Sequence, residues 1–238
     1  MTLNSLLGRA TFLILIILPG ILSGCQGSGN SPGEGPPSEV ALSSTPTHTA
    51  APVETSTPVY TSTPLPTLTP LPPPFLDTFV AALNNGNASQ VVGVFVDGVM
   101  ALKVVQQPAN DPAYVSQLRE IATYFTMVMQ YTGNTGLLAH NYLAGLYYFD
   151  LMPGQVVVLI YGDGRTEEYI VSHGEEYQAL SPNSPTSSFV DLVSGETLNT
   201  MDLFYRVYGG ASRTTFQTCI AQGSEDSWGR LFVIALQE

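Results

Sequence analysis

The sequence predicts a mainly β fold, in which about eight short strands close into a barrel that carries a few short helices. Two observations predict this fold. Short runs rich in β-branched residues recur between turn signals in the latter part of the chain, and the residues ahead of them cannot form a core. The chain accordingly divides into a signal peptide (1–24), a disordered stalk (25–74) and one folded domain (75–238).

Residues 1–24 have the layout of a secretory signal peptide, with Arg9 ahead of a short apolar run. This run is too short to span a bilayer, which needs about 20 apolar residues. It ends in Leu-Ser-Gly-Cys at 22–25, which resembles the lipobox of bacterial lipoproteins. The resemblance implies that lipid on Cys25 anchors the chain to the outer face of the cell membrane. An ordinary signal peptide with an incidental cysteine is the alternative.

The predicted stalk contains twelve of the eighteen prolines and no Lys or Arg between residues 26 and 74. Thr-Pro repeats of this kind favour extended, polyproline-like chain, which suits a spacer between a membrane and a domain. The domain that follows has six basic residues against sixteen acids. Nucleic acid is therefore not expected as a partner, because its phosphates would be repelled.

Several segments of the domain have strand or helix patterns. Residues 91–97 and 99–107 form a predicted hairpin around Asp97-Gly98, and 155–161 and 166–172 form a second one. Apolar residues at helical spacing after Asp111-Pro112 predict a helix that includes Val115, Leu118, Ala122 and Phe125. Short helices are predicted near 189–193 and 201–205, and two final strands at 214–220 and 230–236.

Three residues of the predicted domain, Cys219, His140 and Arg230, have the types needed to cleave a peptide bond. A thiol with a pKa of about 8.5 is mostly protonated at neutral pH, so attack on a carbonyl requires a neighbouring base. His140 supplies this base and can return the proton to the leaving amine. Arg230 keeps its charge and can stabilise the oxyanion. If Cys25 is lipidated, Cys219 is the only remaining cysteine, and no disulfide is expected within the domain.

The segments around these residues resemble those of sortases. Thr-Phe-Gln-Thr-Cys at 215–219 is similar to the Thr-Leu-x-Thr-Cys signature of that family, and Arg230 matches the arginine of its next strand. Residues 137–145 are similar to the segment around the sortase histidine, although Ala139 stands where a glycine is common. The resemblance implies a sortase-like barrel with catalytic His140, Cys219 and Arg230, in which Thr218 and Arg230 also contact the substrate.

The resemblance also implies a reaction. A sortase cleaves a sorting-motif peptide through a thioacyl-enzyme and transfers the acyl group to an amine, such as a cell-wall peptide or a pilin subunit. A cysteine peptidase that resolves the intermediate with water is one alternative. A surface-displayed binding module without turnover is another.

The remaining polar residues are weaker candidates. Asn141 is a candidate to orient His140, His173 is predicted in a surface turn, and His48 falls in the stalk. Acidic pairs at 167–168, 175–176 and 225–226 are candidates for loop Ca²⁺, as in some sortases, but solvated loop charge is the favoured interpretation. No zinc-ligand spacing or phosphate-binding loop is present, so no cofactor is expected.

Overall fold

The structure is a computed structural model that describes residues 76–237, all of which belong to one compact unit. The predicted signal peptide, Cys25, the stalk and His48 lie outside the described residues. The described helices and strands, in chain order, are α1 (Leu76–Leu83), β1 (Val91–Val96), β2 (Met100–Gln106), β3 (Ile121–Tyr124), α2 (Thr126–Thr132), β4 (Thr135–Leu138), the 3₁₀ helix η1 (Ala144–Asp150), β5 (Val156–Tyr161), β6 (Thr166–Ala179), β7 (Phe189–Asp191), β8 (Thr197–Leu198), α3 (Thr200–Tyr208), β9 (Arg213–Gln222) and β10 (Glu225–Leu236).

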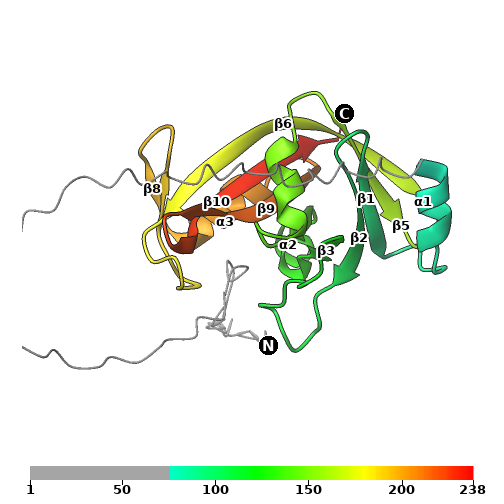
Figure 1. Ribbon diagram of the computed structural model, residues 1–238, viewed down its shortest axis with the longest axis horizontal. Helices are drawn as coiled ribbons and strands as arrows, with labels where there is room; N and C mark the ends of the chain where they lie inside the picture. The colour runs from blue at the N-terminus through cyan, green and yellow to red at the C-terminus, as the bar shows by residue number, and fades with distance from the viewer. Residues whose placement is uncertain (1–75, 238) are drawn as a thin grey trace, which may run out of the picture. The chain divides into compact units, whose positions relative to one another are not determined.

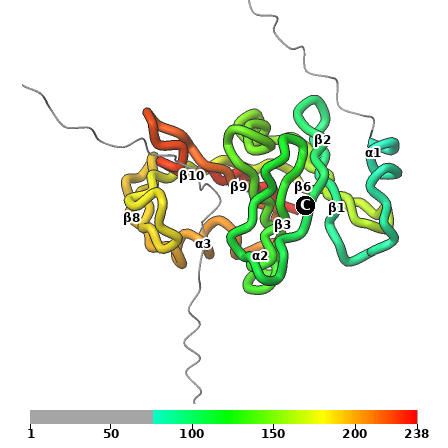
Figure 2. Tube along the Cα trace, turned by 60° about the horizontal axis from the view of Figure 1, so that its bottom comes forward, coloured from blue at the N-terminus to red at the C-terminus, as the bar shows by residue number. Residues whose placement is uncertain are grey.

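Eight of the strands close into a barrel, as the sequence predicts. Their order is β10-β9-β4-β3-β2-β1-β5-β6, and β10 pairs back onto β6. The neighbouring strands are antiparallel except for β2–β3 and β4–β9, which are parallel. The short strands β7 and β8 extend the sheet from β6, at the end of the domain opposite to α1 in both views (Figures 1 and 2). Closure leaves the strands of the barrel without free edges.

Three apolar clusters hold the barrel and its helices together. The first fills the barrel interior with residues such as Leu102, Leu137, Phe216 and Leu231. The second lies between α2, α3 and the outer face of the sheet and includes Phe232. The third lies under α1.

Helix α1 explains why every residue of β1 is buried. Its side chains cover Val92 and Phe95 on the outer face of β1, while the other face of the strand lines the barrel interior. A strand covered on both faces has an almost continuous apolar sequence instead of alternation. Gly93 permits close approach of the helix, because a Cβ there would collide with the side chain of Leu83. Helix α1 is not among the helices predicted from sequence.

The two hairpins and the two final strands predicted from sequence are confirmed. Gly98 has a φ of 69° in the β1–β2 turn, a conformation that glycine adopts without strain. The C-terminal pair is longer than predicted, since β9 ends at Gln222 and β10 begins at Glu225. The predicted helix over 201–205 is also confirmed, as part of α3.

Two predicted helices are wrong. The segment after Asp111-Pro112 has no helix, and its continuation forms β3, which fills the gap between β2 and β4. The apolar spacing is coincidental, because Leu118 is 61% exposed while Ala122 and Phe125 are buried in two different clusters. Residues 189–191 form β7, paired with β6 and β8. In both cases pairing with a distant strand overrides the local pattern.

Candidate active site

Cys219 and Arg230 are directly opposite each other on β9 and β10. The antiparallel register pairs these two residues, and it pairs Gln217 with Phe232 two positions further on. Opposed residues of an antiparallel pair place their side chains on the same face, with Cβ atoms about 4.5 to 5.5 Å apart. The β9–β10 connection around Gly223, which has a φ of 63°, and a register shift between Glu225 and Gly229 together set this register. This connection is shorter than the one between the predicted strands at 214–220 and 230–236.

His140 reaches the same place from β4, which runs parallel to β9. Leu138 pairs with Gln217, and the amide of Ala139 continues the ladder by donating to the Gln217 carbonyl at 3.1 Å. Two residues beyond the Leu138–Gln217 pair, the register sets His140 beside Cys219. Neighbouring strands lie about 4.8 Å apart.

The three side chains share one face of the sheet. Ala139 and Leu231 pack into the barrel interior, whereas Leu138 and Phe232 pack in the cluster on the outer face. Because side chains alternate along a strand, His140 and Arg230 lie on the outer face with these two residues. His140 just beyond the end of β4, Cys219 on β9 and Arg230 on β10 therefore form a row.

The imidazole of His140 is held by two residues that the sequence analysis did not identify. The side chain amide of Gln117 donates from Nε2 to His140 Nε2 at 2.8 Å, and its Oε1 accepts from the hydroxyl of Tyr142 at 3.4 Å. The Tyr142 ring also stacks on the imidazole, with centroids 5.3 Å apart and planes 22° apart. An amide nitrogen only donates, so His140 Nε2 accepts, and a neutral ring carries its proton on Nδ1.

Burial sets the protonation of His140. It lowers the pKa of His140 below its ordinary value of 6.5, while the backbone carbonyl of Val115 acts in the opposite direction. Nδ1 of His140 makes no hydrogen bond of good geometry to the described residues. A histidine in this setting is neutral near pH 7 and can accept a proton.

The guanidinium of Arg230 is fixed by backbone carbonyls. It donates to the carbonyls of Ser227 at 2.8 Å, Gly229 at 2.9 Å and Pro182 at 3.3 Å. Burial lowers the pKa of Arg230 to about 10, while Glu225 acts to raise it. Arg230 is therefore charged near pH 7, and its orientation is tied to the β6–β7 connection that contains Pro182.

Solved structures similar to this chain include sortases. Sortase A of Listeria monocytogenes is 18% identical, with 62% of this chain and 87% of that chain covered and a TM-score of 0.40. Sortase C of Clostridium perfringens SM101 is 13% identical, with 67% and 83% covered and a TM-score of 0.37. Sortase C-1 of Actinomyces oris is 15% identical, with 68% and 80% covered and a TM-score of 0.40. No protein-family profile matches the sequence, and no curated protein matches it.

The sulfur of Cys219 is buried and bonded. Cys219 is 1% exposed, His140 3% and Arg230 2%. The structure gives Cys219 as disulfide-bonded, and residues 76–237 contain no second cysteine. A disulfide sulfur does not attack a peptide carbonyl, so nucleophilic chemistry at this position requires the thiol and an opening of the site.

Two other candidates have structural roles. Thr218 lies between Gln217 and Cys219 on β9, so its side chain points to the opposite face from Cys219, and its hydroxyl lies beneath Gly145 of η1. Contact with a substrate through this side chain is thus not supported. Asn141 does not bind His140; it donates to the backbone carbonyl of Asp226 at 3.0 Å and ties the His140 segment to the β9–β10 turn.

His173 and the acidic pairs are not part of this row, although Glu225 acts on Arg230 and the Asp226 carbonyl accepts from Asn141. His173 is on the surface as predicted, but within the continuous strand β6 and not in a turn, and it contacts Glu175 at 3.0 Å. No group of three or more potential metal-ligating side chains occurs in the described part of the chain. None of the helices between residues 76 and 237 has the length and apolar character of a membrane span.

Proposed function

We propose that this protein is an extracytoplasmic cysteine transpeptidase of the sortase type. The observation that carries the proposal is the row of His140, Cys219 and Arg230 on one face of three neighbouring strands. The predicted signal peptide and lipidated Cys25 would hold the enzyme at the outer face of the cell membrane. A lipid on Cys25 would also occupy the other cysteine of the chain and leave Cys219 as a thiol.

The reaction would proceed in two steps. In the first, His140 takes the proton of the Cys219 thiol, and the thiolate forms a bond to the carbonyl carbon of a sorting-motif peptide. The C–N bond then breaks while His140 gives this proton to the leaving amine. In the second, an acceptor amine forms a new C–N bond, the C–S bond breaks, and His140 takes up the proton of the amine. The acceptor would be a cell-wall peptide or a pilin subunit.

Arg230 fits either of two roles in these steps. Its charge can stabilise the oxyanion that develops when the carbonyl becomes tetrahedral. It can also hold a backbone carbonyl of the substrate, since its donors already bind carbonyl groups in the structure. Both roles require that a substrate displace or share the present contacts.

The test uses the reduced full-length chain, a library of sorting-motif-like peptides and triglycine as the acceptor. We expect mass spectrometry to find an acyl adduct on Cys219 and a peptide joined to triglycine. Cys219→Ala should abolish the adduct, and His140→Gln should slow its formation. An adduct that persists in Cys219→Ala would refute the assignment. An adduct released only as free acid would identify the peptidase alternative.

Burial of all three side chains favours a second candidate, a surface-displayed binding module without turnover. The two functions differ in the reactivity of the reduced thiol. An enzyme should show alkylation of Cys219 by iodoacetamide near pH 7 that falls sharply in His140→Gln. In an inert module, alkylation would be slow in both proteins and would become fast only on unfolding.

A further inference from the structure

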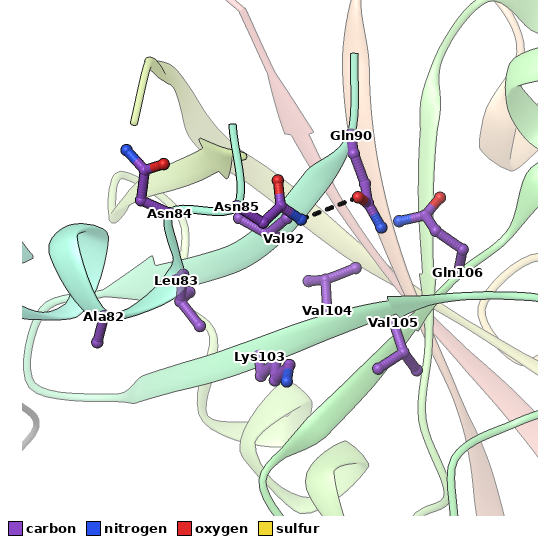
Figure 3. Close-up of a pocket in the computed structure, with 10 residues that line it drawn as sticks. All are labelled: Ala82, Leu83, Asn84, Asn85, Gln90, Val92, Lys103, Val104, Val105 and Gln106. Atoms are coloured by element: carbon purple, nitrogen blue, oxygen red, sulfur yellow. Dashed lines mark hydrogen bonds between the residues drawn. The ribbon is translucent and has the colours of Figure 1, made fainter. Parts of the chain in front are cut away.

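A pocket of about 440 Å³ lies on the outer face of β1 and β2, next to the end of α1 (Figure 3). It is at the α1 end of the domain, opposite to the β9–β10 turn in both views (Figures 1 and 2). The pocket is therefore separate from the row of His140, Cys219 and Arg230. Its volume is in the range of small-molecule sites, about 300 to 1,000 Å³.

The wall of the pocket is fixed by hydrogen bonds. The amides of Asn85 and Gly86 both donate to the carbonyl of Gly162, at 2.8 and 2.7 Å. The Oδ1 of Asn84 accepts from the amide of Gly86 at 3.1 Å, and the Oδ1 of Asn85 accepts from the amide of Asn87 at 2.9 Å. A ligand would thus bind to a preformed wall and would not need to order this loop.

Two glutamines in the pocket use only half of their hydrogen-bonding groups for the fold. Gln90 accepts at Oε1 from Asn85 at 3.0 Å, and Gln106 donates from Nε2 to the Val91 carbonyl at 2.9 Å. Their amide nitrogens face each other in Figure 3, and the Gln106 oxygen points away from Gln90. The Gln90 Nε2 donor and the Gln106 Oε1 acceptor make no hydrogen bond within residues 76–237. The pocket thus offers one donor and one acceptor, and hydroxyl groups can bind to both kinds of group.

Lys103 gives the pocket a positive charge. It is the only lysine of the chain, it is exposed, and its ammonium makes no ion pair in the described part. No acidic residue lines the pocket, although the chain has a net charge of −12. A lysine ammonium binds phosphates and carboxylates as a point charge. The pocket thus favours an anionic group.

The rest of the lining is aliphatic and includes Leu83, Val92 and Val105. It contains no aromatic side chain on which a planar group would stack. We propose that this pocket binds a polyol that carries one anionic group, with the anion at Lys103 and the hydroxyls at Gln90 and Gln106. Polyol phosphates and uronic acids share this chemistry.

The single lysine allows a direct test. The full-length chain labelled with ¹⁵N only at lysine gives one backbone amide signal, from Lys103. We expect glycerol 3-phosphate or glucuronate to shift this signal with a dissociation constant on the order of 1 mM. Glycerol, glucose and inorganic phosphate should bind at least about tenfold more weakly, which is about 1.4 kcal/mol. The relative affinity of the two anionic compounds identifies the source of the ligand.

Variants of the lining residues show whether binding takes place in this pocket. Gln90→Leu and Gln106→Leu should each weaken the binding of anionic polyols several-fold. The control Gln130→Leu, at an exposed position on α2, should leave binding unchanged. Lys103→Met, followed by calorimetry, should remove the preference for the anionic compounds.

Phosphate that binds as tightly as glycerol 3-phosphate would mean an adventitious ion only. That result, no binding by either anionic polyol, or an equal effect of Gln130→Leu would overturn the proposal. The titration does not depend on Cys219 chemistry, so it can fail while the transpeptidase assay succeeds.

Discussion

Adding a single methyl group at Gly145, close to His140, should have a large effect on both stability and acylation. Gly145 lies in η1, and its amide donates to the carbonyl of His140 at 3.0 Å. A Cβ added there would collide with the hydroxyl of Thr218 and lie 2.7 Å from the His140 carbonyl oxygen. Ordinary contact begins at 3.4 Å, so the backbone at His140 would have to move by about 0.7 Å. Overpacking of this kind costs about 1 to 3 kcal/mol.

We therefore expect Gly145→Ala to lower the free energy of unfolding by about 2 kcal/mol. For a domain of this size the melting temperature would fall by about 4 to 8 °C. Displacement of His140 from Cys219 should also slow acylation more than about tenfold, since catalytic geometry tolerates little misplacement. Urea denaturation and the adduct assay measure the two effects.

Gly174→Ala in β6 is the matched control. A Cβ there would meet no atom closer than 3.8 Å, so the change should be neutral, or slightly stabilising through the reduced entropy of the unfolded chain. If Gly145→Ala destabilises no more than Gly174→Ala, η1 does not support the His140 segment in the way described.

Three further changes test the surroundings of the site. Thr218→Val removes a buried hydroxyl that has no hydrogen-bond partner in the described part, so it should raise stability by about 1 kcal/mol in urea denaturation and leave turnover unchanged. Gln117 positions the His140 imidazole, so Gln117→Leu should lower the rate of acylation about tenfold and change the pH profile of that rate. The melting temperature should stay the same. An unchanged pH profile would exclude a positioning role for Gln117. Burial lowers the pKa of His140 below 6.5, so the unfolded chain binds this proton more tightly. The resulting stability is complete above about pH 6.5 and is lost as the pH falls towards the folded-state pKa; His140→Gln should remove this dependence, as measured by denaturation at several pH values.

Local patterns predicted the strands well where a turn residue dictates the pairing. Asp97-Gly98 and the turn at 162–165 join adjacent segments, so each hairpin could be identified from neighbouring residues alone. The helix predicted over 111–125 was wrong because the apolar residues of this segment contact distant partners. Thr123, which interrupts the apolar pattern, pairs with Leu138 and accepts from the amide of Ser116 at 2.8 Å inside the structure.

Sequence motifs singled out His140, Cys219 and Arg230 as candidates but did not indicate the side chains around them. Gln117 lies in an exposed connection and matches no motif, and only the fold brings it 2.8 Å from His140. Asn141 follows His140 directly, yet it binds the β9–β10 turn.

The sequence by itself determined the residue types available for chemistry, the order of the strands along the chain and the abrupt change from proline-rich chain to an apolar domain. These features depend on composition and on contacts between near neighbours. Only the tertiary structure decided that β4 lies parallel to β9, which brings His140 next to Cys219 although 78 residues lie between them in the sequence. It also decided that Arg230 is held by peptide carbonyls and that Lys103 faces a pocket. Such features arise from strand pairing between distant segments, for which a local pattern carries little information.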